Sequence, residues 1–138
     1  MNIAVVYWSG TGNTAALAEM VAQGAQEKGA NVDLREAFSF SSSEVGNYDG
    51  FAFGCPAMGA EELEGDEFEP MFSSLESSLD GKRVVLFGSY DWGDGEWMRT
   101  WKDRCLSDGA EVLDTLIVNN APDQVALGKA RELGASLI

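Results

Sequence analysis

The sequence predicts an α/β fold: a five-stranded parallel sheet in the doubly wound order 2-1-3-4-5, with helices on both faces. Short apolar runs alternate with amphipathic segments along the whole chain, which is typical of parallel strands joined by right-handed helical crossovers. Residues 3–7 are continuously apolar, as in a strand that is buried on both faces. Five strands favour the stated order. The length of 138 residues suits one compact domain, so we expect a single domain over residues 1–138.

The first half of the chain gives three strands and one clear helix. After the strand at residues 3–7, a helix is expected over residues 14–28, because apolar residues recur there at helical spacing and a glycine follows. Residues 31–35 are half polar, as in an edge strand, and residues 51–54 form a short apolar strand. Residues 37–49, between these two strands, favour a loop with at most a short helix.

The second half alternates helix and strand more regularly. The expected elements are a helix with Phe72, Leu75 and Leu79 on one face, a strand at 83–89, a helix at 96–108, a strand at 112–118 and a helix at 122–137. Trp97, Trp101 and Cys105 recur every four residues, so we expect them to pack in the core. Trp8, at the end of the first strand, could belong to the core or to a binding site.

The composition narrows the function. The net charge is −14, from 23 acidic and nine basic residues, and there is no histidine. The lack of histidine argues against a histidine-dependent hydrolase and a zinc enzyme. The acidic balance argues against binding of nucleic acid or anionic membranes and favours basic protein partners, although such charge can also serve solubility alone.

Cysteine usage and the terminal sequence indicate the compartment. Cys55 and Cys105 form no CxxC motif and are expected to be buried, free thiols. No apolar run is long enough to span a bilayer, and the chain shows no signal-peptide pattern at its start. We therefore expect a cytoplasmic monomer.

The loop at residues 9–14 has the features of a phosphate-binding site. It combines two glycines, which let the backbone approach a ligand, with four hydroxyl or amide side chains: Ser9, Gly10, Thr11, Gly12, Asn13 and Thr14. The following helix directs unpaired N–H groups to the same place. The loop lacks the lysine of nucleoside triphosphatase loops and the GxGxxG spacing of dinucleotide sites. The alternative is an ordinary glycine turn that caps a helix.

Two further loops after strands are unusual, at residues 55–62 and 90–95. Met58 can lay a polarizable side chain against an aromatic ring, and Gly59 permits a positive φ. A turn with a buried methionine is an equally good interpretation of that loop alone. Trp92 lies among acidic and glycine residues, where it suits stacking on a planar ligand better than a core. Because ligands of open α/β sheets bind outside the carboxyl ends of the strands, these loops predict one shared site.

Several segments resemble the short-chain flavodoxins of anaerobic bacteria. In order along the chain they are residues 7–14 (YWSGTGNT), 54–59 (GCPAMG), 67–70 (EFEP), 86–90 (LFGSY) and 92–98 (WGDGEWM). The resemblance implies the flavodoxin-like fold, which is itself a standard example of the ligand position just described. It also implies non-covalently bound FMN and a low-potential, one-electron carrier between redox proteins, with no substrate turnover of its own.

The resemblance further assigns contacts with the isoalloxazine ring. Met58 and Trp92 would cover its two faces. Gly59 would supply the carbonyl that turns toward flavin N5 on reduction, and Glu61 would accept the N3–H. Backbone groups of Asp91 and its neighbours would meet the pyrimidine edge.

The phosphate and the ribityl chain complete the expected set. Residues 9–14 would hold the phosphate, and Ser89 and Asn120 are candidates for ribityl contacts. No catalytic residue and no metal ligand is expected. The cofactor-binding residues are therefore expected to be Ser9, Gly10, Thr11, Gly12, Asn13, Thr14, Pro56, Ala57, Met58, Gly59, Ala60, Glu61, Ser89, Tyr90, Asp91, Trp92, Gly93 and Asn120.

Two residues depart from the pattern of the family. Pro56 stands where some relatives have a serine that can reach the phosphate. Asp91 stands where glycine is usual, so it adds a side chain and a negative charge near the flavin. The backbone N–H of residue 91 is kept, and we therefore expect FMN binding to be kept as well.

Acidic residues gather around the expected site. We expect basic redox enzymes, both reductases and oxidoreductases, to dock on this acidic rim. Its members lie within or directly after the second and third loops: Glu61, Glu62, Glu64, Asp66, Glu67, Glu69, Asp91, Asp94 and Glu96.

Three other classes of protein were compared with the motifs. An FMN-dependent NAD(P)H or quinone reductase is the remaining alternative, although no second glycine-rich nucleotide loop is visible; rapid bleaching of the flavin by NADH or NADPH would favour it. A phospho-acceptor receiver domain needs acidic residues after its first and third strands, where this chain has Ser9-Gly10 and Gly54-Cys55. A tyrosine phosphatase needs a Cys-x5-Arg loop, which the chain lacks.

Overall fold

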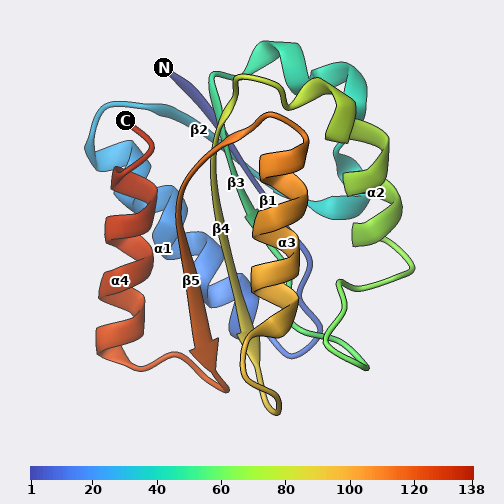
Figure 1. The fold of residues 1–138 in the computed structure, drawn as a ribbon. Coiled ribbons are helices and arrows are strands. Elements are labelled where there is room, and N and C mark those ends of the chain that lie inside the picture. The colour runs from blue at the N-terminus through green and yellow to red at the C-terminus, as the bar shows by residue number, and fades with distance from the viewer.

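All 138 residues are described by a computed structural model, in which five parallel strands form one sheet of order β2-β1-β3-β4-β5 (Figure 1). The predicted fold class and strand order are confirmed. The half-polar strand β2 lies at one edge and β5 at the other. The strands are β1 Asn2–Tyr7, β2 Asn31–Glu36, β3 Gly50–Gly54, β4 Arg83–Tyr90 and β5 Glu111–Asn119.

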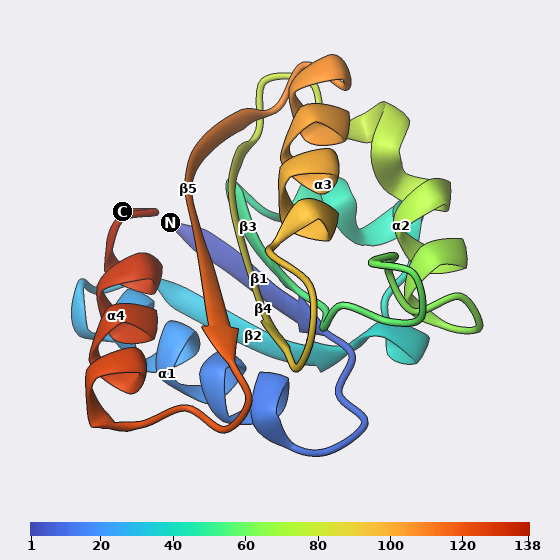
Figure 2. The ribbon, with the colours of Figure 1, turned by 60° about the horizontal axis from the view of Figure 1, so that its bottom comes forward.

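Helices cover both faces of the sheet. Figures 1 and 2 show α1 and α4 side by side on one face, and α2 and α3 on the other. This two-sided cover explains why β1, β3 and β4 are buried along nearly their whole length. The helices are α1 Asn13–Glu27, α2 Phe68–Leu75, α3 Glu96–Ser107 and α4 Gln124–Ala135, with short 3-10 helices η1 Ala37–Ser39, η2 Ser42–Asn47 and η3 Glu76–Ser78.

The core has one half on each face of the sheet. Because successive strand residues point to opposite faces, Phe51 and Phe53 of β3 join the half under α2 and α3, whereas Ala52 joins the half under α1 and α4. The first half is rich in aromatic rings and includes Trp97 and Trp101, which are almost fully buried, as predicted. The site is thus built at the ends of central strands that are buried on both faces.

The structure differs from the expected elements in three places. The helix expected to carry Phe72, Leu75 and Leu79 ends at Leu75, and Leu79 follows the 3-10 helix η3. Residues 37–49 hold two 3-10 helices instead of at most one short helix. The second, η2, begins with a capping box between Ser41 and Glu44, so Ser41 caps a helix that the sequence did not indicate. The last helix begins at Gln124 rather than 122, because the Asp123 carboxylate accepts a hydrogen bond from the Ala126 N–H at 2.8 Å. None of the helices has the length and apolar character needed to cross a membrane.

Candidate cofactor site at the carboxyl ends of the strands

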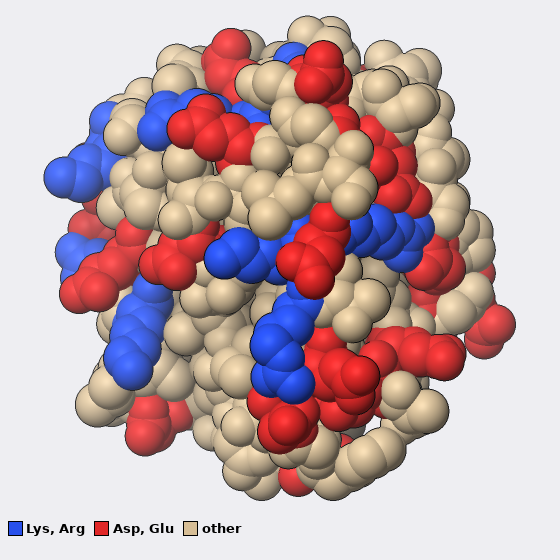
Figure 3. All heavy atoms as spheres, in the orientation of Figure 1, with Lys and Arg blue, Asp and Glu red and all other residues tan.

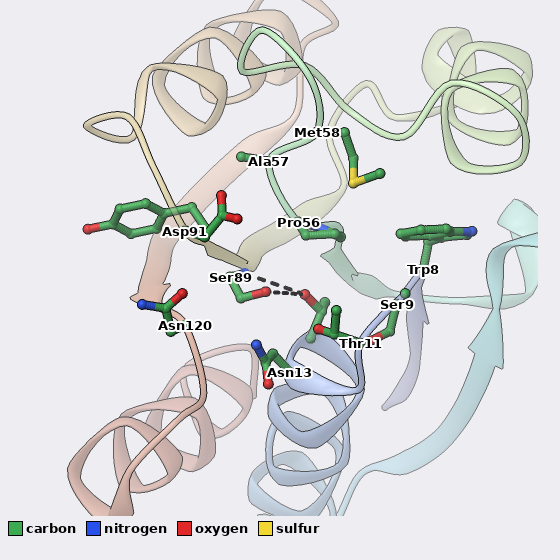
Figure 4. Close-up of a pocket in the computed structure, with 13 residues that line it drawn as sticks. Trp8, Ser9, Thr11, Asn13, Pro56, Ala57, Met58, Ser89, Asp91 and Asn120 are labelled. Atoms are coloured by element: carbon green, nitrogen blue, oxygen red, sulfur yellow. Dashed lines mark hydrogen bonds between the residues drawn. The ribbon is translucent and has the colours of Figure 1, made fainter.

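A cavity of about 260 Å³ lies where the loops after β1, β3 and β4 meet (Figure 4). The three loops singled out in the sequence therefore form one site, with a further residue from the segment after β5. Figure 4 shows Met58 and Trp8 on one side of the cavity, and Asp91 and Asn120 on the other. The lining residues are Trp8, Ser9, Gly10, Thr11, Asn13, Thr14, Pro56, Ala57, Met58, Ser89, Tyr90, Asp91 and Asn120.

Most of the predicted residues line this cavity, but six do not. They belong to the same loops and lie around the cavity rather than in its wall: Gly12, Gly59, Ala60, Glu61, Trp92 and Gly93. Trp8, for which the sequence left two possibilities, lines the cavity and also packs against the core. Its position directly before the glycine loop is the feature of the sequence that could have assigned Trp8 to the binding site.

The N-terminus of α1 forms the anion-binding end of the cavity. The Ser9 Oγ accepts hydrogen bonds from the N–H groups of Gly12, at 3.1 Å, and Ala15, at 3.2 Å. Four other N–H groups of the loop and first helical turn donate to no acceptor in the chain: those of Gly10, Thr11, Asn13 and Thr14. The first turn of α1 holds no acidic residue. These donors, together with the helix dipole, suit a phosphate without any basic side chain.

Thr14 joins this end of the cavity to β4. Its side chain is buried, and its Oγ1 lies 3.1 Å from the Ser89 Oγ (Figure 4). The Ser89 N–H also donates to the Thr14 Oγ1, at 3.4 Å. The sequence predicted separate roles for these two hydroxyls, at the phosphate and at the ribityl chain. The structure adds a direct contact between them, and the two roles stay predictions.

The loop after β3 is held along β4. The Cys55 N–H donates to the Phe87 carbonyl at 3.1 Å, and the Ala57 N–H donates to the Ser89 carbonyl at 3.0 Å. The buried Trp97 Nε1 donates to the Cys55 carbonyl at 3.2 Å. These bonds place Pro56, Ala57 and Met58 in the cavity wall. Pro56 has no N–H, and its lack interrupts no bond, because the hydrogen bonds between this loop and β4 are donated by Cys55 and Ala57 on either side of it.

Cys55 lies buried beneath the loop that it begins. Burial raises the pKa of its thiol far above the ordinary value, because the apolar surroundings disfavour a thiolate. Burial also raises the pKa of Cys105, to about 12. Both cysteines are free and buried, as predicted.

The turn from Met58 to Glu62 is closed by reciprocal hydrogen bonds. The Met58 N–H donates to the Glu62 carbonyl at 2.8 Å, and the Glu62 N–H donates to the Met58 carbonyl at 2.9 Å. Gly59 has a φ of 51°, so the predicted positive φ is confirmed. Glu61 also has a positive φ, which the sequence did not indicate. The Met58 side chain stays 38% exposed, open to a ligand at the mouth.

The loop after β4 carries Trp92 at the edge of the cavity. Trp92 is 59% exposed, which confirms that it is not a core residue. The preceding Tyr90 is fixed by the Asn120 N–H, which donates to its carbonyl at 2.7 Å. Asn120 adopts a φ of 57°, a conformation that asparagine tolerates better than most residues.

The donor set suits a phosphorylated planar ligand and no metal. No group of three or more histidine, cysteine or acidic side chains is arranged to hold an ion. The residues present fit FMN: the free N–H groups at α1 would hold the phosphate, and the loops after β3 and β4 would hold the ring. The roles expected for Gly59 at N5 and for Glu61 at N3–H stay predictions.

Comparisons with known proteins agree with this fit. The family model for flavodoxin matches residues 5–134. The flavodoxin of Megasphaera elsdenii is 46% identical over 132 residues, which cover 96% of this chain and 95% of that protein. The flavodoxin of Clostridium beijerinckii is 46% identical over 121 residues, which cover 87% of this chain and 88% of that protein.

Solved structures show the same architecture. The solution structure of two-electron reduced Megasphaera elsdenii flavodoxin superposes with a TM-score of 0.91 at 44% identity, covering 98% of this chain and 97% of that one. The residues that line the cavity all lie within the matched region. The chain therefore belongs to the flavodoxin family: it binds FMN and carries single electrons at low potential, and it is an electron-transfer protein rather than an enzyme.

Proposed function

We propose that this flavodoxin exchanges electrons with basic redox enzymes, reductases and oxidoreductases, that dock on the acidic rim beside its cavity. When bound, FMN supplies a redox centre that accepts and releases one electron at a time. The protein supplies the binding site, the negative surroundings and the surface that a partner meets. The observation that supports docking here is the arrangement of carboxylates around the mouth of the cavity.

The structure divides the carboxylates of the expected rim into two groups. Glu64 is 6% exposed and faces inward, and Glu69 forms an ion pair with Arg104 at 2.7 Å, so neither is free for a partner. Asp94 pairs with Arg99, and the Glu61 carboxylate accepts hydrogen bonds from the N–H groups of Gly95 and Glu96. We define the acidic rim by the exposed carboxylates that have no basic partner: Glu62, Asp66, Glu67, Asp91 and Glu96.

The acidic rim lies over the loops that surround the cavity. Figure 3 shows acidic side chains over much of this face, including a group in its lower right part, where Figure 1 places the loop after β3. Basic side chains lie among the acidic ones across the middle and left of the same face. A basic partner would therefore be attracted toward the loops that carry Met58 and Trp92, which is where electron transfer needs it.

The same carboxylates favour a low potential. At ~12 Å in water-like dielectric, one carboxylate disfavours an added negative charge by about 0.3 kcal/mol. The five members of the acidic rim together give roughly 1.5 kcal/mol before salt screening, or roughly 0.07 V for one electron. The acidic rim is thus one contributor to the low potential. The lack of basic side chains at the anion-binding end and the expected stacking of Trp92 on the flavin ring are others.

The experiment is a stopped-flow measurement of electron transfer from the reduced holoprotein to a basic c-type cytochrome at low and moderate ionic strength. We expect the rate to fall several-fold as salt rises. The double variant Asp66→Asn/Glu67→Gln should weaken this dependence. The matched control, Glu19→Gln/Glu111→Gln, removes the same charge from exposed positions outside the acidic rim and should behave as wild type. A flat salt profile, or equal effects of both double variants, would contradict docking at the acidic rim.

We further propose that the protein acts as a monomer in the cytoplasm. Its charge of −14 makes copies repel one another, and its two free thiols are typical of a reducing compartment. Sedimentation of the holoprotein and fractionation of cells that produce it are the corresponding tests. A stable dimer, or recovery outside the cytoplasm, would contradict these assignments.

A further inference from the structure

Glu61 is held in an unfavourable backbone conformation. Its φ is 55°, and the only other non-glycine residue with a positive φ is Asn120. For a residue with a long side chain this conformation costs about 1–2 kcal/mol. Asparagine tolerates it because of its short polar side chain, and glutamate has no such advantage. The surrounding structure must therefore hold Glu61 in place.

The Glu61 side chain makes the contacts that hold it. Its Oε1 accepts hydrogen bonds from the N–H groups of Gly95, at 3.2 Å, and Glu96, at 3.0 Å. α3 begins at Glu96, and Gly95 has no side chain with which to cap it. Glu61 thus caps α3 from a different loop, and its negative charge suits the positive end of the helix dipole.

Gly93 gives the carboxylate room. A Cβ at residue 93 would lie 2.6 Å from the Glu61 Cδ, so the carboxylate lies directly against the backbone of this glycine. The φ of Gly93 is 90°, a second reason why a larger residue would not fit. The loop after β4 therefore wraps around the Glu61 carboxylate on the side that follows Trp92.

The other end of Glu61 is fixed to the turn that carries Met58. The next residue, Glu62, exchanges two backbone hydrogen bonds with Met58, at 2.8 and 2.9 Å. A single residue therefore connects the Met58 turn with the Trp92 loop. These are the two loops expected to cover opposite faces of the flavin ring.

We propose that Glu61 is a positioning residue: its carboxylate ties the Met58 turn to the Trp92 loop and so sets the separation of the two loops before FMN enters. Ordering both loops in advance lowers the entropic cost of binding. The proposal rests on FMN binding and is independent of the docking of partners. It differs from a role as acceptor of the flavin N3–H, because the tie is formed within the protein.

Three variants distinguish this connection between the two loops from a direct contact of Glu61 with the flavin. Glu61→Ala removes the acceptor. Glu61→Gln keeps an oxygen that can accept from Gly95 and Glu96 but removes the charge. Glu61→Gly removes the acceptor and also relieves the backbone strain, so we expect it to fold even if the alanine variant does not. Glu62→Ala is the matched control, since this neighbouring exposed carboxylate makes no side-chain hydrogen bond.

The first measurement is the dissociation constant of FMN, from the quenching of its fluorescence. We expect Glu61→Ala and Glu61→Gly to bind FMN about ten- to a hundredfold more weakly, Glu61→Gln to recover most of the affinity, and Glu62→Ala to match wild type. The same titration with 3-methyl-FMN, which has no N3–H, should show the same fold-loss for Glu61→Ala. Hydrogen exchange of the Gly95 and Glu96 amides in the FMN-loaded protein should speed up in the alanine and glycine variants only.

Several results would contradict the proposal that Glu61 positions the two loops. Equal losses in the alanine and glutamine variants would show that the charge matters and the geometry does not. A loss that disappears with 3-methyl-FMN would reduce Glu61 to a ligand of the flavin. Unchanged exchange at Gly95 and Glu96 would show that the cap of α3 does not depend on Glu61.

Discussion

The hydroxyls of Thr14 and Ser89 lie 3.1 Å apart inside the cavity, one from the first turn of α1 and the other from the end of β4. Their residues are 75 positions apart in the chain. The contact joins the anion-binding end of the site to the strand that supports the ring-binding loops. It also gives each hydroxyl a partner that does not depend on a ligand.

The first prediction concerns this pair. Thr14→Ala should weaken FMN binding by about 1–3 kcal/mol and riboflavin binding far less, because hydrogen bonds to a charged phosphate are the stronger ones. Because the hydroxyls are coupled, the effects of Thr14→Ala and Ser89→Ala should not add in the double variant. Fluorescence titration with both ligands measures this. Thr100→Ala, on the exposed side of α3, is the control. Equal losses for FMN and riboflavin would exclude Thr14 from the phosphate site.

The second prediction concerns Gly59. No atom lies within 4 Å of a Cβ built at this residue, so Gly59→Ala meets no clash and acts only through its positive φ. Gly59 already has this positive φ in the structure, so part of the cost of about 1–2 kcal/mol falls on the folded protein itself. We assign the rest to reduction, because the turn must then present its carbonyl to N5. We expect FMN affinity in the oxidised state to be nearly unchanged and the first one-electron potential to drop by several tens of millivolts.

A spectroscopic redox titration measures this shift. Gly65→Ala is the matched control, because Gly65 also has open space around its Cβ position but no positive φ. An unchanged first potential in Gly59→Ala would show that Gly59 serves the turn alone.

The third prediction concerns Glu64, which is buried but charged. Burial raises the pKa of its carboxyl, but hydrogen bonds from the N–H groups of Phe68 and Glu67, both at 2.8 Å, and of Asp66, at 2.9 Å, lower it more, so the pKa lies below the ordinary value. Glu64→Ala should destabilise the protein by about 2–3 kcal/mol, because it leaves the N-terminus of α2 uncapped.

The pH dependence of that effect has a definite sign. A carboxyl with a lowered pKa contributes stability above its unfolded pKa, and this contribution is lost as the pH falls through its folded pKa. The difference between wild type and Glu64→Ala in urea unfolding should therefore shrink below about pH 4. Glu67→Gln, an exposed neighbour, is the control and should show little difference at any pH.

The fourth prediction concerns Asp108, at the end of α3. Burial, followed by the hydrogen bond and the charge of Glu76, raises the pKa of its carboxyl to about 6 against the attraction of Arg104. Its Oδ2 is buried and has no hydrogen-bond partner. Because the pKa is raised in the folded protein, protonation of Asp108 stabilises the fold. This stabilisation is fully present below the pKa of the unfolded chain and is lost as the pH rises through about 6.

Asp108→Asn should therefore stabilise the protein at pH 7 by about 1 kcal/mol, since the amide stays uncharged and can donate to Glu76. The gain should vanish near pH 4, where wild type is protonated as well. Urea unfolding at the two pH values checks this. The control is Asp103→Asn, an exposed carboxylate of the same helix. A gain that does not depend on pH would show that the charge of Asp108 costs nothing.

The sequence by itself determined the fold and most of the cavity wall. Local patterns carry this information: the apolar run of β1, the glycine and hydroxyl residues at 9–14 and the alternation of strands and helices act within a few residues of one another. Parallel strands joined by right-handed crossovers leave few arrangements. Trp92 could also be placed outside the core, because its neighbours in the chain are polar.

Tertiary structure alone decided how distant residues share the site. The Thr14–Ser89 contact, the inward orientation of Glu64 and the cap that Glu61 places on α3 join segments that no local pattern relates. The positive φ of Glu61 contradicts its propensity, and it is held by hydrogen bonds to residues more than 30 positions away. Sequence spacing specifies which residues reach the carboxyl edge of the sheet. Which donor each acceptor finds there is fixed only when the loops close against one another, because side-chain hydrogen bonds depend on distances of a few tenths of an ångström.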